Sequence, residues 1–117
     1  MGHIINFAAP VLPGQSERAK SFAKELDPHM DEFVRLNKEA TITRFETFVQ
    51  ETPMGDLQLY LMEADDPTKL RPIVPGGTPY DDWWLGYLRD VNGIDLLAIQ
   101  ETEPPMPPTP VFTWPPA

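Results

Sequence analysis

The chain has no cysteine and only two histidines, His3 and His29. Without thiols it cannot form a disulfide, use a thiolate nucleophile or build a cysteine-based metal site. Two imidazoles are also too few for a multi-histidine metal site within one chain. We therefore expect no metal site within the chain. We also expect no cofactor. Because disulfides are rare in the cytoplasm, the absence of cysteine favours a cytoplasmic protein.

Basic residues and long apolar runs are also scarce. Nine Lys and Arg residues stand against 18 Asp and Glu residues, which gives a net charge of −9. Binding to nucleic acid or to an anionic membrane needs a basic surface, so we expect neither partner. No apolar run is long enough to span a membrane, and the start of the chain, MGHIINFAAP, lacks the pattern of a secretory signal. Small molecules and other copies of the chain remain as expected partners.

The strongest pattern present is a β-hairpin. Residues 41–51 are rich in Thr, Phe, Val and Ile, a turn sequence follows, and residues 57–64 form a returning strand. A turn centred on Met54 and Gly55 predicts that Glu46 lies opposite Glu63. One face of the hairpin is the more uniformly apolar and is expected to face the helices: Phe45, Thr47, Val49, Tyr60, Met62 and Ala64. The other face carries Arg44, Glu46, Phe48, Gln50, Leu59, Leu61 and Glu63.

Other elements flank this hairpin. Residues 4–9 form an apolar run typical of a buried strand. Two helical segments follow, divided at Asp27 and Pro28, and the second is expected to turn Met30, Phe33, Val34 and Asn37 inward. A last helix begins near Thr78 with a cap and a proline and ends at Gly93.

Residues 94–100 are predicted to be a final strand, and the chain then becomes rich in proline. Proline cannot continue a helix or a central strand, so residues 104–117 are predicted to be an extended arm beyond a domain of residues 1–103. The element order is therefore β-α-β-β-α-β with a split first helix. This order predicts an α+β protein of the ferredoxin-like class.

Two segments in this order, FETFVQETPMGDLQLYLMEADDP and PYDDWWLGYLRDVNGIDL, resemble proteins of the dimeric α+β barrel superfamily, in an uncharacterised bacterial branch of it. The resemblance covers about residues 3–100. It implies a homodimer in which two sheets face each other, with a pocket between sheet and helices in each subunit. The superfamily includes cofactor-free enzymes, heme-dependent enzymes and proteins with no known reaction, so it implies no single activity.

Six residues are candidates for a site. His29 suits proton transfer near neutral pH, or it is an ordinary surface residue in the first turn of a helix. Glu46 and Glu63 suit acid–base chemistry if they are paired, or they form a polar ladder or ion pairs with a dimer mate. Tyr60 could contribute a buried hydroxyl to catalysis. The candidates for substrate binding are Arg44, which could anchor an anion, and Trp83, which could pack against a ligand.

Two functions follow from these observations. The first is a homodimeric protein that binds a small molecule, either as a cofactor-free isomerase or monooxygenase or without catalysis. The second is a noncatalytic dimer that binds a partner through the proline-rich arm. The homodimer is expected because Phe48, Leu59 and Leu61 would otherwise leave an apolar patch on the open face of the hairpin.

Overall fold

The computed structural model describes residues 2–70, 73, 75–98, 111–112 and 114–115. Three strands form one antiparallel sheet: β1 (His3–Pro10), β2 (Ile42–Gln50) and β3 (Leu57–Ala64), in the order β1-β3-β2. The helices are α1 (Ser16–Lys20), α2 (Phe22–Leu26), α3 (Met30–Glu39) and α4 (Pro79–Asn92). Two short 3-10 turns complete the order, η1 (Asp27–His29) and η2 (Pro67–Lys69). The protein is therefore of the α+β class.

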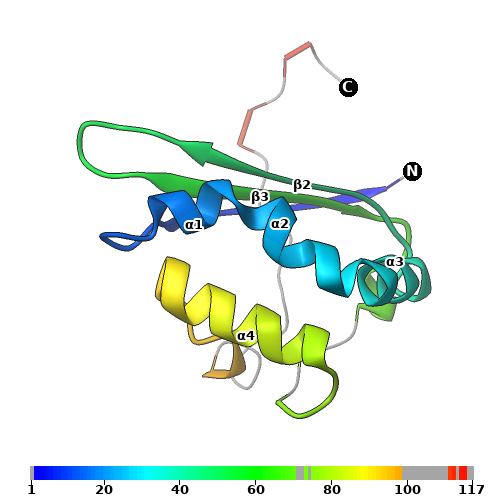
Figure 1. The fold of residues 1–117 in the computed structure, drawn as a ribbon. Helices are drawn as coiled ribbons and strands as arrows, with labels where there is room; N and C mark the ends of the chain where they lie inside the picture. The colour runs from blue at the N-terminus through cyan, green and yellow to red at the C-terminus, as the bar shows by residue number, and fades with distance from the viewer. Residues whose placement is uncertain (1, 71–72, 74, 99–110, 113, 116–117) are drawn as a thin grey trace.

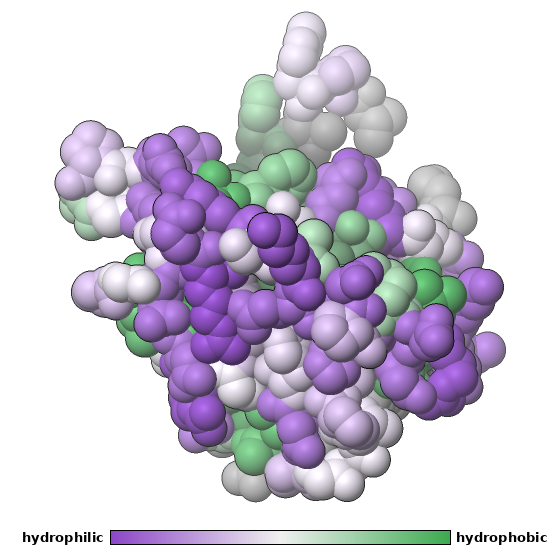
Figure 2. Space-filling view, viewed as in Figure 1, coloured by the Kyte–Doolittle hydropathy of each residue, from purple (hydrophilic) through white to green (hydrophobic). Residues whose placement is uncertain are grey.

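The elements form two layers, with the helices on one side of the sheet (Figure 1). Side chains of the expected inner hairpin face pack under these helices, and Tyr60 and Ala64 are fully buried there. The opposite face of the sheet has no layer over it among the described residues. Hydrophilic residues cover most of the side seen in Figure 2, in keeping with the high acidic content.

The hairpin register differs by two residues from the sequence prediction. Glu46 lies opposite Leu61, and Glu63 lies opposite Arg44. The predicted Glu46–Glu63 pair is therefore wrong. Because side chains alternate with a period of two, a shift of two residues exchanges the partners but keeps each side chain on its predicted face.

The turn explains the shift. The Gly55 N–H donates to the Thr52 carbonyl at 3.1 Å, so the turn spans residues 52–55 and its centre is Pro53 and Met54. Proline favours the first central position of a β-turn, because its ring fixes φ near the value that position requires. Gly55 takes a φ of 121°, which a residue with a Cβ adopts only with strain.

The α4 helix has the predicted boundaries. The Thr78 hydroxyl accepts a hydrogen bond from the Asp81 N–H, Pro79 takes the first helical position, and Gly93 at φ 67° ends the helix. The inner face of α4 packs against the sheet, α1, α2 and α3. The buried residues in and beside these elements together form the core: Ala9, Val11, Ala19, Phe22, Leu26, Leu36, Tyr60, Tyr80, Trp84, Tyr87, Leu88 and Val91.

Residues 94–98 do not form the predicted final strand. The Ile94 N–H donates to the Leu88 carbonyl, which folds the chain back on the end of α4. The Asp95 side chain then accepts from the Ala98 N–H at 3.2 Å, as an N-cap does, and residues 96–98 are helical. Residues 99–100 of that prediction lie outside the described residues, so the described order is β-α-β-β-α.

A buried polar network joins the sheet to the end of α4. The Tyr60 hydroxyl donates to Asn92 Oδ1 at 2.6 Å, and Asn92 Nδ2 donates to the Pro10 carbonyl at 2.9 Å and to Gln58 Oε1 at 3.3 Å. The Tyr87 hydroxyl also donates to Gln58 Oε1, at 3.0 Å. These contacts satisfy polar groups that would be costly to bury unpaired.

Most of the predicted arm of residues 104–117 lies outside the described residues. Of the described ones, Val111, Phe112 and Trp114 are largely exposed, so they do not dock on the body of their own chain. Among the helices that the structure describes, none has both the length and the apolar character needed to cross a membrane.

Candidate functional site

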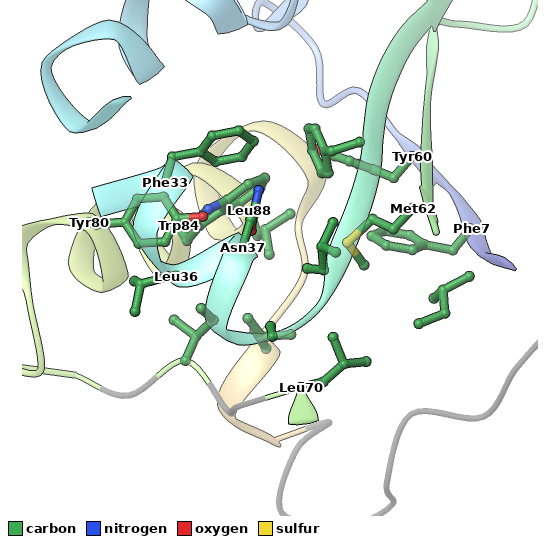
Figure 3. A pocket seen from close by; sticks show the side chains of 16 residues that line it. Phe7, Phe33, Leu36, Asn37, Tyr60, Met62, Leu70, Tyr80, Trp84 and Leu88 are labelled. Atoms are coloured by element: carbon green, nitrogen blue, oxygen red, sulfur yellow. The ribbon is translucent and has the colours of Figure 1, made fainter. Parts of the chain in front are cut away.

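A cavity of about 230 Å³ lies between the sheet, α3 and α4 (Figure 3). The sheet contributes alternate residues of its helix-facing side, since that face points every second side chain inward. The helices contribute positions three or four residues apart. The lining residues are Ile5, Phe7, Phe33, Leu36, Asn37, Ala40, Ile42, Phe45, Tyr60, Met62, Leu70, Ile73, Tyr80, Trp84, Leu88 and Leu96.

The lining is apolar and rich in aromatic rings. Phe7 stacks on Tyr60 with ring centroids 4.7 Å apart, and Phe45 meets Phe33 and Trp84 edge-on at 5.7 Å and 6.0 Å. None of the sixteen described lining residues is an aspartate, glutamate, histidine, lysine or arginine. The cavity therefore suits an uncharged ligand, because a buried charge without a partner is strongly unfavourable.

Two lining side chains have polar groups that make no hydrogen bond among the described residues. One is the Asn37 amide, which extends from α3 among the lining residues, and the other is the indole N–H of Trp84. Asn37 follows Phe33 and Leu36 on the same side of α3, which explains why an amide lies in an apolar wall. Of the four residues predicted to point inward from this helix, Phe33 and Asn37 do so, whereas Met30 and Val34 are exposed.

Tyr60 is the only one of the six sequence candidates among the described lining residues. Its hydroxyl is committed to Asn92 Oδ1 at 2.6 Å. Burial raises the pKa of Tyr60 well above the usual value for a phenol, with a smaller contribution from Tyr87. The hydroxyl is therefore protonated at neutral pH and acts as a hydrogen-bond donor.

The structure brings Arg44, Glu46 and Glu63 together on the open face of the sheet, away from the cavity. Arg44 lies between the two carboxylates, with Nη2 3.0 Å from Glu46 Oε2 and Nη1 3.7 Å from Glu63 Oε1. The hydrogen bond to Glu46 and the charges of both carboxylates raise the pKa of Arg44. The three residues thus form an ion-pair cluster.

His29 and Trp83 lie together at a third place. The His29 ring stacks on Trp83 with centroids 5.7 Å apart, and the Trp83 indole N–H donates to Glu25 Oε1 at 3.1 Å. Burial alone would raise the pKa of Glu25, but hydrogen bonds from Arg18 and Trp83 outweigh it and lower that pKa. His29 and Trp83 are not among the described residues that line the cavity, so the six candidates do not converge on one site.

Sequence reasoning missed part of the cavity wall. Leu36 and Ala40 belong to the same side of α3 as Phe33, and their spacing of three and seven residues from Phe33 was the available signal. Leu70 and Ile73 come from the connection between η2 and α4. No periodic pattern marks residues in such a connection, and only the folded chain brings them to the cavity.

Comparison with protein-family models, with curated proteins and with solved structures finds no match for this chain. The cavity and the open sheet face are therefore interpreted from their own geometry.

Proposed function

We propose that the protein is a homodimeric small-molecule-binding protein whose ligand occupies the cavity between the sheet and the helices. The observation that carries this proposal is the cavity itself, about 230 Å³ of partly open space lined by apolar and aromatic side chains. Well-packed cores contain few voids larger than a water molecule. An engineered apolar cavity of about 150 Å³ already admits benzene, so this one is large enough for a small organic molecule.

The lining supports binding without catalysis in the cavity. Proton transfer needs a side chain that changes its charge near the working pH and reaches the reacting atom. The described lining residues include no carboxylate, imidazole or amine, and the Tyr60 hydroxyl is already bonded to Asn92. Glu46, Glu63 and His29 stay predictions as catalytic residues of a site elsewhere, since each lies away from this cavity.

The open face of the sheet supports the homodimer. Phe48 is 50% exposed there, Ile4 48% and Leu57 38%, with the less exposed Leu59 and Leu61 beside them. An apolar patch of this kind on a small protein marks an interaction surface. A second copy covering it would give the face-to-face arrangement of sheets that the dimeric α+β barrel superfamily implies, with the Arg44 cluster at the same interface.

Calorimetric titration with naphthalene tests the ligand site. Ala40 is buried and lines the cavity, so Ala40→Phe places a ring in the space that the ligand needs. Ala23→Phe adds the same ring on the exposed side of α2 and is the matched control. We expect wild type and Ala23→Phe to bind alike and Ala40→Phe to bind at least about tenfold more weakly, since the ligand would lose most of its burial.

Circular dichroism must show that both variants fold. Absence of naphthalene binding to the wild type, or equal binding by all three proteins, would refute the proposed site.

A further inference from the structure

We infer that the ligand of the cavity is a neutral fused-ring aromatic molecule with one hydroxyl or carbonyl group, and that Asn37 determines its orientation by a hydrogen bond to that group. This inference rests on the proposed function, since it names the chemical class that the same cavity takes. The absence of charge, the aromatic lining, the volume and the position of Asn37 support it in turn.

The charge of the lining comes first. No described lining residue is a cation or an anion at neutral pH, so an ionised ligand would lose its hydration without gaining an ion pair. That loss is large for a carboxylate or an ammonium group. The ligand is therefore neutral.

The shape follows from the aromatic side chains. Six of the lining residues carry rings: Phe7, Phe33, Phe45, Tyr60, Tyr80 and Trp84. They come from the sheet, α3 and α4, so rings line more than one side of the space; in Figure 3, Phe7 and Tyr60 lie across from Phe33, Tyr80 and Trp84. Aromatic rings prefer stacked or edge-on contact with other rings, so a flat aromatic ligand gains more here than a flexible chain of equal size.

The volume of the cavity limits the size of the ligand. Benzene fits an apolar cavity of about 150 Å³, and scaling its six ring atoms to the volume found here gives about nine or ten. The cavity of about 230 Å³ thus matches two fused rings, and a larger ring system would require the walls to move.

Asn37 supplies the orientation. Its amide can donate through Nδ2 and accept through Oδ1, and it makes no hydrogen bond among the described residues. A hydroxyl on the ligand could donate to the amide oxygen or accept from the amide nitrogen, and a carbonyl could accept. The amide can both donate and accept, whereas the Trp84 indole N–H can only donate, and a few polar groups in a mostly apolar site typically fix the orientation of the ligand in this way.

The test compares four probes by calorimetry: naphthalene, 2-naphthol, 2-naphthoate and 1-decanol. We expect 2-naphthol to bind about fivefold more tightly than naphthalene, the gain typical of one additional hydrogen bond. Naphthoate should bind roughly a hundredfold more weakly than 2-naphthol because its charge has no partner in the lining. Decanol, similar to 2-naphthol in number of heavy atoms but flexible, should bind more weakly than either neutral ring compound.

Asn37→Leu keeps the branched shape of the side chain and removes the amide. This variant should bind naphthalene like the wild type and lose the preference for 2-naphthol. Asn6→Leu, an exposed position on the other face of the sheet, is the matched control and should keep that preference.

The outcomes separate the inference from the proposed function. Equal preference for 2-naphthol in the wild type and in Asn37→Leu would overturn the role of Asn37. Tighter binding of decanol or naphthoate would overturn the ligand class while leaving the cavity as a binding site. If no probe binds the wild type up to its solubility limit, both the inference and the proposed function fail.

Discussion

The buried network around Asn92 allows a specific prediction about stability. Two tyrosine hydroxyls donate to two buried acceptors, and only one of these acceptors has a second donor among the described residues. Tyr60→Phe removes the only donor that the structure gives Asn92 Oδ1. Tyr87→Phe removes one of two donors to Gln58 Oε1, which keeps the Asn92 amide at 3.3 Å. The two variants lose the same atom, but only the first leaves a buried acceptor without a partner among the described residues.

The expected magnitudes follow from this difference. Leaving a buried acceptor unpaired costs about 1–3 kcal/mol of unfolding free energy, whereas loss of one hydrogen bond with a remaining partner costs about 0.5–1.5 kcal/mol. Urea unfolding followed by circular dichroism measures both values, and an unchanged slope with urea shows that the unfolded state is comparable. We expect Tyr60→Phe to be the less stable variant by about 1 kcal/mol. Equal stability, or a less stable Tyr87→Phe, would refute the proposed hydrogen-bond pattern.

The same pair predicts a dependence on alkaline pH. Burial raises the pKa of both Tyr60 and Tyr87 above 10, the value of a free phenol. A group with a raised pKa in the folded state contributes stability that is complete below the unfolded pKa and is lost as pH rises above it. The wild type should therefore lose stability above about pH 10. Tyr60→Phe should lose less over that range, and an equally steep loss would contradict the assignment.

Three further predictions concern other parts of the molecule. Phe48→Glu places a charge on the open sheet face and should reduce the mass in light scattering from twice 13.3 kDa to 13.3 kDa. Met54→Glu, at the exposed hairpin tip, is the control and should leave the dimer intact. A wild type of 13.3 kDa would contradict the homodimer. Glu25→Gln should lower the melting temperature at pH 7, and its stability should vary less than that of the wild type as pH falls below 4.5. A carboxylate with a lowered pKa stabilises the folded state only while it is charged. Parallel curves of stability against pH for the two proteins would refute this. Gly55→Ala should destabilise the protein by about 1 kcal/mol because of the φ of 121°. Gly86→Ala within α4 should be neutral or stabilising, since its new methyl group meets only the end of the Arg89 side chain. The reverse order of stability in thermal unfolding would be inconsistent with the two backbone conformations.

In the hairpin, sequence patterns predicted the strands and their faces but not the residues at the centre of the turn. Strand propensity and alternation placed β2, β3 and their two faces correctly, because burial of one face determines the phase of the side chains. The pattern alone did not determine the tip: the prediction placed the centre of the turn at Met54 and Gly55, whereas the structure places it at Pro53 and Met54. The two choices give the same faces but different partners, so the predicted contact between Glu46 and Glu63 was wrong.

Residues 94–98 show that a short apolar run does not by itself identify a strand. Ile94, Leu96 and Leu97 are apolar enough for a buried strand, and this predicted the strand. In the structure, Gly93 and Asp95 provide local hydrogen bonds that reverse the chain and begin a helical turn. Local capping therefore outweighs a short apolar pattern, which is ambiguous between helix and strand.

The candidate site was only partly predictable. Phe45 of β2 and Tyr60 of β3 were expected to face the helices, and both line the cavity. The cavity itself depends on how α3, α4 and the connection after η2 meet the sheet, and these long-range contacts leave no spacing signal in the sequence. The chemical types that suggested a site lie elsewhere: the two glutamates are on the open face of the sheet, and the histidine is in η1 beside Trp83.

The most direct test of the central claim is an NMR spectrum of methyl-labelled methionine recorded with and without naphthalene. Met62 lines the cavity, whereas Met54 is 98% exposed at the hairpin tip and Met30 lies on the outside of α3. Binding in the cavity predicts that the Met62 methyl resonance shifts and shows contacts to the naphthalene protons, while Met54 and Met30 do not change. Unchanged Met62, or equal changes at all three methyl groups, would contradict the assignment of the cavity as the ligand site.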